Sequence, residues 1–150
     1  MKNIGVIGNG FVGTAIVSGF SLHANVRVYD KDSRKSIDTL EDTINKSDFV
    51  FVGVPTPMTS VDGGKIDLSI MDSVFEDLSK LNKNENTIFI IKSTVIPGTT
   101  KAYQQKYKNL KIIFNPEFLT ERSANLDFIN TSRIILGGDT EDVEAVEKLY

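Results

Sequence analysis

Short apolar runs alternate along this chain with longer segments in which apolar residues recur at helical spacing. The short runs are rich in valine and isoleucine, which is typical of strands that helices cover on both faces of a parallel sheet. We therefore predict strands near residues 3–8, 26–30, 49–54, 87–92, 111–115 and 133–137.

The segments between these runs predict helices. The clearest helical patterns cover residues 11–22, 67–82, 98–108 and 140–150. A weaker pattern covers 33–45, and Asp67 and Thr140 are suited to cap two of the clearer helices. The alternation of strands and helices predicts an α/β fold of the doubly wound Rossmann type, with a six-stranded, mostly parallel sheet and helices on both faces.

A glycine-rich turn, GNGFVG at residues 8–13, joins the first predicted strand to the first predicted helix. Because it follows a strand and opens a helix, this GxGxxG pattern indicates dinucleotide binding. We expect Gly8 to permit the tight turn, Gly10 to let the backbone approach a pyrophosphate, and Gly13 to let the helix pack closely on the strand. Amides at the helix start would then face the phosphates. The alternative is a connection that binds no ligand.

An aspartate ends the second predicted strand, at the distance from the turn where this fold places a carboxylate for the adenosine ribose. Asp30 therefore favours NAD over NADP, because it would repel a 2′-phosphate. Lys31, Arg34 and Lys35 follow it and leave NADP open as a cofactor. The alternative for these three basic residues is a solvated loop without a ligand.

Composition narrows the range of functions. The 17 basic and 20 acidic residues give a net charge of −3, and they form no basic stripe of the kind that binds nucleic acid. The N-terminal apolar run is too short for a signal peptide or a spanning helix, so we expect a cytoplasmic protein without membrane attachment. The chain has no cysteine and a single histidine, His23, which argues against a metal site.

Three more loops at the carboxyl ends of predicted strands are distinctive. They read VPTP at residues 54–57, KSTVIPGTT at 92–100 and NPEFLTE at 115–121. Together with the glycine turn and the later Ala124, Asp127 and Arg133, they resemble the NAD-binding domain of the UDP-glucose/GDP-mannose 6-dehydrogenase family across nearly the whole chain. Each loop alone is a weak signal, but four in this order, each at a strand end, are specific.

The resemblance implies an enzyme that oxidises the C6 alcohol of UDP-glucose, or of a related nucleotide sugar, to a carboxylate. The reaction uses two NAD and passes through an aldehyde and a cysteine-bound acyl intermediate. The family pattern implies a catalytic Thr94 at the reacting centre and a catalytic Glu117 in thioester hydrolysis.

The resemblance also implies two sets of binding residues. The implied substrate-binding residues are Glu117, Phe118, Leu119, Thr120 and Glu121. The implied NAD-binding residues are Gly8, Gly10, Phe11, Val12, Gly13, Asp30, Lys35, Val54, Pro55, Thr56, Thr94 and Glu121. Several of these have structural alternatives that the sequence leaves open: the prolines can end a strand, Thr94 can cap a turn, and Glu117 can be an exposed loop carboxylate.

The chain also departs from the family pattern. Only eighteen residues, 31–48, separate Asp30 from the third predicted strand, where the family carries a longer insertion. Thr120 stands where the family often has arginine or alanine. The family's central domain, which supplies the catalytic lysine, asparagine and cysteine, is absent from residues 1–150, and no cysteine is present for the covalent steps. We therefore expect the dinucleotide-binding domain alone, monomeric or weakly associated, and inactive without a further domain or partner chain.

Two other functions remain open from the sequence. One is a self-standing NAD-binding module, or a subunit without its own catalysis. The other is a member of the related β-hydroxyacid dehydrogenase group, which shares the turn and Asp30 but is not expected to carry both VPTP and NPEFLTE.

Overall fold

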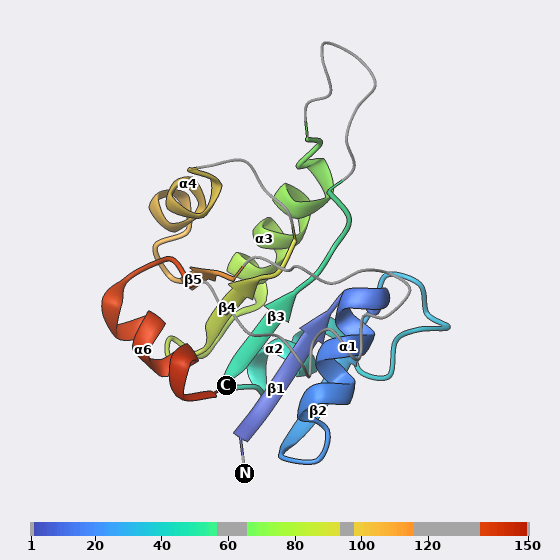
Figure 1. Ribbon diagram of the computed structural model, residues 1–150. Coiled ribbons are helices and arrows are strands. Elements are labelled where there is room, and N and C mark those ends of the chain that lie inside the picture. Colours follow the sequence, from blue (N-terminus) through green and yellow to red (C-terminus); the bar gives the residue numbers. More distant parts are fainter. Residues whose placement is uncertain (1, 57–65, 94–97, 116–135, 150) are drawn as a thin grey trace.

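The computed structural model describes residues 2–56, 66–93, 98–115 and 136–149, and its centre is a five-stranded parallel sheet (Figure 1). The strands are β1 Lys2–Ile7, β2 Ala24–Tyr29, β3 Phe49–Val52, β4 Ile88–Ile91 and β5 Lys111–Phe114. They lie in the order β2-β1-β3-β4-β5, and every neighbouring pair is parallel. The predicted α/β class and strand positions are therefore confirmed for these five strands.

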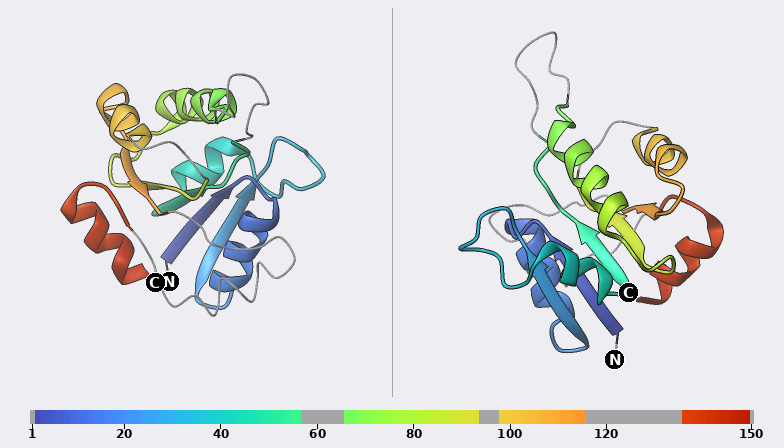
Figure 2. Two further views of the ribbon diagram at one scale, coloured as in Figure 1. Left: turned by 45° about the horizontal axis from the view of Figure 1, so that its top comes forward. Right: turned by 180° about the vertical axis from the view of Figure 1, so that it is seen from behind.

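Helices cover both faces of the sheet, as predicted (Figure 2). They are α1 Phe11–Phe20, α2 Leu40–Asn45, α3 Ser69–Leu81, α4 Thr99–Lys106 and α6 Thr140–Leu149. One apolar cluster joins α2, α3 and α4 to one face, and a second joins α1 and α6 to the other. Successive residues of β3 alternate between the clusters, since Val50 and Val52 enter the first while Phe49 and Phe51 enter the second.

The strand order creates a topological switch point. The chain leaves β1 toward β2 on one side and then returns to β3 on the other side of β1. In open α/β sheets, a crevice forms at such a point outside the carboxyl ends of the strands, and ligands bind there. The glycine turn follows β1 directly, so the fold places it at this crevice.

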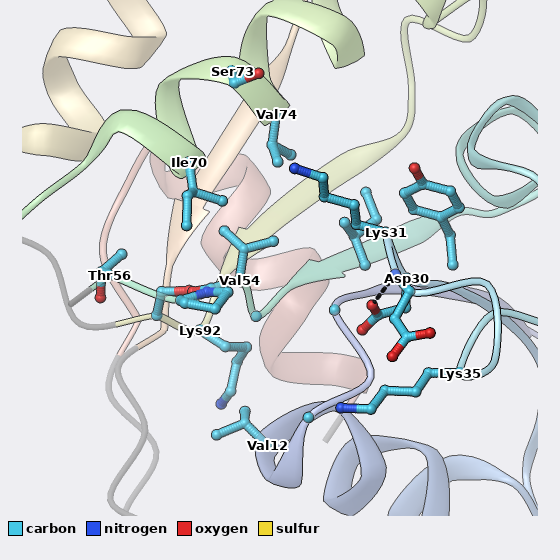
Figure 3. Close-up of a pocket in the computed structure, with 18 of the residues that line it drawn as sticks. Val12, Asp30, Lys31, Lys35, Val54, Thr56, Ile70, Ser73, Val74 and Lys92 are labelled. Atoms are coloured by element: carbon cyan, nitrogen blue, oxygen red, sulfur yellow. Dashed lines mark hydrogen bonds between the residues drawn. The ribbon is translucent and has the colours of Figure 1, made fainter.

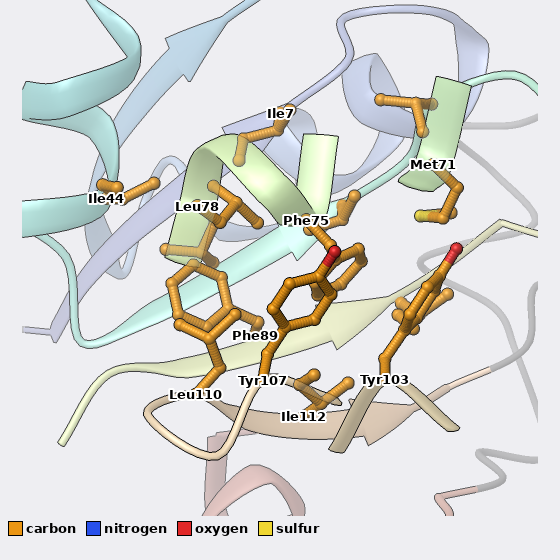
Figure 4. Packing of buried hydrophobic residues seen from close by; sticks show 14 residues of the cluster. Ile7, Ile44, Met71, Phe75, Leu78, Phe89, Tyr103, Tyr107, Leu110 and Ile112 are labelled. Atoms are coloured by element: carbon orange, nitrogen blue, oxygen red, sulfur yellow. The ribbon is translucent and has the colours of Figure 1, made fainter. Parts of the chain in front are cut away.

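The first cluster is centred on aromatic side chains that α3 and α4 bring together (Figure 4). Met71, Phe75 and Leu78 form the buried stripe of α3. The ring of Phe75 stacks on Tyr103, with centroids 4.8 Å apart, and lies 6.4 Å from Tyr107. This stacking fixes α3 against the segment that leads into β5.

Tyr103 also makes a polar contact within the first cluster. Its hydroxyl donates a hydrogen bond to a carboxylate oxygen of Asp72 on α3. Burial, and secondarily the Asp72 carboxylate, raises the pKa of the Tyr103 hydroxyl well above its ordinary value. The phenol therefore stays protonated and remains a donor over the whole range in which proteins are usually handled.

The sixth predicted strand, 133–137, lies largely outside the described residues. Within the described part, Gly137 forms an antiparallel bridge with Phe114, in which the two amides donate to the two carbonyls at 2.7 and 2.8 Å. This bridge extends the sheet beyond β5 by a single residue pair. The complete sixth strand stays a prediction.

The prediction of a helix over residues 33–45 is wrong for the first half of that range. Residues 31–38 form turns, and α2 begins only at Leu40, where the Thr39 hydroxyl accepts the Asp42 amide at 3.1 Å. Asp38 explains the difference, because its carboxylate accepts the Val28 amide of β2 at 2.9 Å while its own amide donates to the Val28 carbonyl. The segment thus pairs with the edge strand instead of continuing a helix.

The two predicted helix caps, Asp67 and Thr140, each lie one position away from the residue that directly precedes the helix. Thr140 is the first residue of α6, and the Asp139 carbonyl accepts the Val143 amide. Asp67 precedes α3 by two residues and accepts the Ser69 amide at 2.9 Å through its side chain. Both shifts lie within the usual uncertainty of helix ends.

The hydroxyl of Tyr103 should contribute measurably to stability. We expect Tyr103→Phe to lower the free energy of unfolding by about 1–2 kcal/mol, because it removes a hydrogen bond to a charged acceptor and keeps the stacked ring. Tyr107→Phe is the matched control, since its hydroxyl bonds to no described residue, and it should change stability by less than about 0.5 kcal/mol. Urea unfolding followed by circular dichroism measures both. Equal losses in the two variants would contradict this role.

Candidate functional site

A cavity of about 1110 Å³ lies at the switch point (Figure 3). It is somewhat larger than the roughly 300–1,000 Å³ typical of small-molecule sites, which fits an extended ligand. Its wall includes the ends of four adjacent strands, the glycine turn and one side of α3. The predicted binding residues that line it are Gly8, Gly10, Val12, Asp30, Lys35, Val54, Pro55 and Thr56.

The glycine turn is built by close approaches of backbone to backbone. Gly8 has a φ of 94°, and a Cβ there would lie 2.6 Å from the carbonyl oxygen of Gly53. A Cβ at Gly13 would lie 2.0 Å from the carbonyl oxygen of Gly8. Neither position accepts a side chain, so the tight turn and the close packing of helix on strand that the sequence predicts are both seen.

Gly10 differs from the other two glycines of the turn. A Cβ at this position would meet no atom of residues 2–56, 66–93, 98–115 or 136–149 within 4 Å. Its φ of −82° and ψ of −159° are also open to other residues. Packing against the described part of the chain therefore does not require glycine at position 10, and Gly10 lines the cavity.

Asp30 links the end of β2 to the glycine turn. One carboxylate oxygen accepts the Asn9 amide at 2.7 Å, and the other accepts the Asp32 amide at 2.7 Å. Each oxygen has a second lone-pair direction, so the carboxylate can still accept from a ligand hydroxyl. Asp30 thus holds the turn in place and faces the cavity at the same time.

Asn9 makes the matching connection from the turn, and the sequence prediction missed it. Its side-chain amide donates to the Lys35 carbonyl at 2.9 Å, and its oxygen accepts the Thr14 hydroxyl at 3.2 Å. The loop after β2 is therefore tied to the start of α1. A polar residue between the two glycines was the only signal in the sequence.

The three basic residues after Asp30 differ in their surroundings. Arg34 forms a two-contact ion pair with Asp32, at 3.1 and 2.9 Å. The Arg34 guanidinium, together with the Arg34 amide, holds the pKa of the Asp32 carboxyl below its ordinary value. Lys31 and Lys35 line the cavity instead. Of the three predicted basic residues, two thus lie at the cavity and Arg34 does not.

A polar row follows the carboxyl ends of β3, β4 and β5. The Ser93 hydroxyl donates to the Val54 carbonyl at 2.6 Å, and the Lys92 ammonium donates to the Asn115 side-chain oxygen at 2.8 Å. Lys92, Ser93 and Asn115 are all buried. All three follow predicted strands, but the sequence predicts no role for them, since a polar residue at a strand end is common.

Helix α3 forms the remaining wall and was predicted only as structure. Its cavity-lining residues are Ser69, Ile70, Ser73, Val74 and Asp77. Ile70 and Val74 lie one turn apart and present an apolar surface, with Val54 across from them in Figure 3. A flat apolar group could pack there.

The predicted catalytic and substrate-binding residues lie outside the described residues. This applies to Thr94 and to the loop 117–121, so their placement stays a prediction. Phe11 is described as the first residue of α1.

Two general findings concern the described ranges only. Their histidine, aspartate and glutamate side chains form no group that could hold a metal ion. No helix in these ranges has the length and apolar character needed to cross a membrane.

The chain is similar to known dehydrogenases. The UDP-glucose 6-dehydrogenase of Streptococcus pneumoniae is 26% identical over 98% of this chain and 44% of its own length. The UDP-glucose 6-dehydrogenase of Haloferax volcanii is 30% identical over 92% of this chain and 41% of its own length. The chain thus spans less than half of these curated relatives. Their alignments extend over 175 and 179 positions, so each relative carries additional residues within the matched region.

A solved structure shows the same fold. The UDP-D-ManNAc dehydrogenase of Pyrococcus horikoshii superposes with a TM-score of 0.85 over 99% of this chain and 44% of its own, at 22% identity. The family model for the NAD binding domain of UDP-glucose/GDP-mannose dehydrogenases matches residues 31–150. This match covers the three strand-end loops on which the predicted resemblance depends. The chain therefore belongs to the UDP-glucose/GDP-mannose dehydrogenase family, as its NAD binding domain.

Proposed function

We propose that this chain is the NAD-binding half of a cytoplasmic nucleotide-sugar 6-dehydrogenase, which oxidises the C6 alcohol of UDP-glucose or a related nucleotide sugar to a carboxylate. The observation that carries the proposal is that the glycine turn and Asp30 line the same cavity. The names of the relatives support the substrate class. When bound, NAD supplies the acceptor for the hydride that leaves the sugar C6.

The residues fit the adenosine half and the pyrophosphate of NAD. The open space at Gly10 and the amides at the start of α1 suit the pyrophosphate, which the positive end of the helix dipole also favours. Asp30 has the capacity to accept hydrogen bonds from the ribose hydroxyls. The apolar surface of Val54, Ile70 and Val74 suits the adenine ring.

The remaining roles come from the family pattern. Val54, Pro55 and Thr56 would contact the cofactor where β3 ends, and Lys35 would also bind the cofactor. Thr94 and Glu117 would act at the reacting carbon, while residues 117–121 would bind the nucleotide sugar, with Glu121 also beside the nicotinamide. The covalent steps need a cysteine that this sequence does not contain, so they would depend on a further domain or a partner chain.

The lack of cysteine also favours a second candidate, an NAD-binding module or subunit without its own catalysis. The two candidates differ in whether the chain needs a further catalytic domain to function. The dehydrogenase requires a cysteine-bearing central domain, encoded in the same gene or next to it, and restored turnover on adding that domain would exclude the simple module.

We predict that NAD binds and that NADP binds more weakly. Asp30 would accept from the ribose hydroxyls, and a charged hydrogen bond of this kind contributes about 1.5–3 kcal/mol. The arginine that could bind a 2′-phosphate, Arg34, is paired with Asp32. In calorimetric titrations, Asp30→Ala should weaken NAD binding and raise the NADP-to-NAD affinity ratio. Asp38→Ala, outside the cavity, should leave the ratio unchanged, and equal affinities in the wild type would refute the assignment.

The turn glycines give a matched pair of variants. Gly10→Ala should fold with normal stability but lose NAD affinity by roughly tenfold or more, because its methyl group takes the space proposed for the pyrophosphate. Gly13→Ala should instead lose about 1–3 kcal/mol or more of stability through its clash with the Gly8 carbonyl. Thermal unfolding and NAD titration separate the effects. A destabilised Gly10→Ala, or one with wild-type affinity, would contradict this reading.

We expect the isolated chain to reduce no NAD when given UDP-glucose. Correct positioning of the reacting groups can account for about 7–11 kcal/mol of a barrier, and most sugar contacts would come from the central domain. Absorbance of NADH is the measurement, with and without a separately expressed central domain from a relative. Steady turnover by the chain alone, with UDP-glucuronate as product, would overturn the proposal.

A further inference from the structure

A carboxylate two residues after Asp30 binds the arginine of the same loop. Asp32 lines the cavity, whereas Arg34 does not. One oxygen of the Asp32 carboxylate accepts the Arg34 Nε at 3.1 Å, and the other accepts Nη2 at 2.9 Å. These contacts occupy the planar fork with which an arginine binds either a carboxylate or a phosphate.

Backbone contacts of Asp32 support this pairing. Its carboxylate also accepts the Arg34 amide at 3.0 Å, and its carbonyl accepts the Lys35 amide at 2.9 Å. The Arg34 side chain, and secondarily the Arg34 amide, hold the pKa of the Asp32 carboxyl below its ordinary value. At this point of the loop, the group at the cavity is therefore a charged carboxylate and not the guanidinium.

The two lysines of this loop lie on either side of Asp30. In Figure 3, Lys31 extends toward Val74 on α3, and Lys35 extends toward the start of α1. Both lysines line the cavity. Arg34 differs from them, because an ion pair within the loop holds its side chain and it does not line the cavity.

This arrangement bears on the difference between the two nicotinamide cofactors. NADP carries a phosphate on the 2′-hydroxyl of the adenosine ribose, and NAD does not. With the ribose at Asp30, this phosphate would lie beside the loop that follows, where an arginine accommodates it in folds that bind NADP. Here the arginine is paired with Asp32, and drawing it to the phosphate would leave the Asp32 charge facing that phosphate.

We propose that Asp32 is a second determinant of cofactor selectivity, which disfavours NADP by retaining Arg34 and by placing its own charge at the cavity. Asp30 repels a 2′-phosphate directly, whereas Asp32 also withholds the cation that could bind it. The inference rests on the proposed function, because it takes the cavity to be the dinucleotide site.

The expected effect is large enough to measure. Removing one negative charge about 10 Å from a phosphate, at the effective dielectric constant of about 20 that applies near protein surfaces, changes the affinity by about tenfold. Asp32→Asn removes the charge and keeps an oxygen that can accept the Arg34 amide. Because Arg34 is exposed, the loss of the ion pair should have little effect on stability.

The test is a double-mutant cycle in which NAD and NADP are titrated against the whole chain by calorimetry. Asp32→Asn removes the carboxylate charge, Arg34→Met removes the guanidinium, and a third variant carries both changes. Glu76→Gln is the matched control, because Glu76 forms an exposed ion pair with Lys80 on α3 and does not line the cavity. Thermal unfolding establishes that each variant is folded.

Asp32→Asn should raise the NADP-to-NAD affinity ratio about tenfold, and adding Arg34→Met should remove most of that gain. Arg34→Met alone and Glu76→Gln should keep the wild-type ratio. NAD should stay the preferred cofactor in every variant, because Asp30 is retained.

The proposal is wrong if folded Asp32→Asn keeps the wild-type ratio, or if Arg34→Met leaves the gain intact. A loss of NADP affinity in Arg34→Met alone would also overturn it, and this outcome can be measured even if Asp32→Asn does not fold. A wild-type chain that binds neither cofactor would instead overturn the proposed function, and this inference with it.

Discussion

Where β1 ends, three stretches of backbone meet with no side chain between them. The Cα of Gly13 packs against the Gly8 carbonyl, and Gly8 packs against the backbone of Gly53 at the end of β3. This contact brings the amide end of α1, the turn and the third strand to one point of the sheet. The position of the cavity follows from it, because a side chain at Gly13 would push α1 away from β1, and one at Gly8 would part β1 from β3.

The parts of the fold that follow from local chemistry were predictable from the sequence. Buried strands covered on both faces need continuous β-branched residues, and the runs around Val50 and Ile90 have no other simple explanation. The glycine turn was predictable because it lies between a predicted strand and a predicted helix. Asp30 was predictable because it follows the turn at the separation that is typical of dinucleotide-binding folds. Their roles toward a ligand remain predictions, as do those of Thr94 and Glu117.

The features that the sequence did not reveal depend on contacts between distant segments. Asp38 is bonded to Val28, ten residues earlier, and this contact outweighs the weak helical pattern at 33–45. Lys92 and Asn115 lie 23 residues apart and meet only because β4 and β5 are neighbours. In each case the residue type alone is also compatible with a solvated loop, and only the folded structure shows the contact.

The hydrogen bonds around Asn9 have a consequence for how a ligand would be received. The turn, the loop after β2 and the first turn of α1 are joined by hydrogen bonds within the protein, through Asn9 and Asp30. The conformational entropy of ordering this wall is therefore lost during folding, not on association, which leaves more of the interaction energy available as affinity. These segments would also open together in hydrogen exchange, as one cooperative unit.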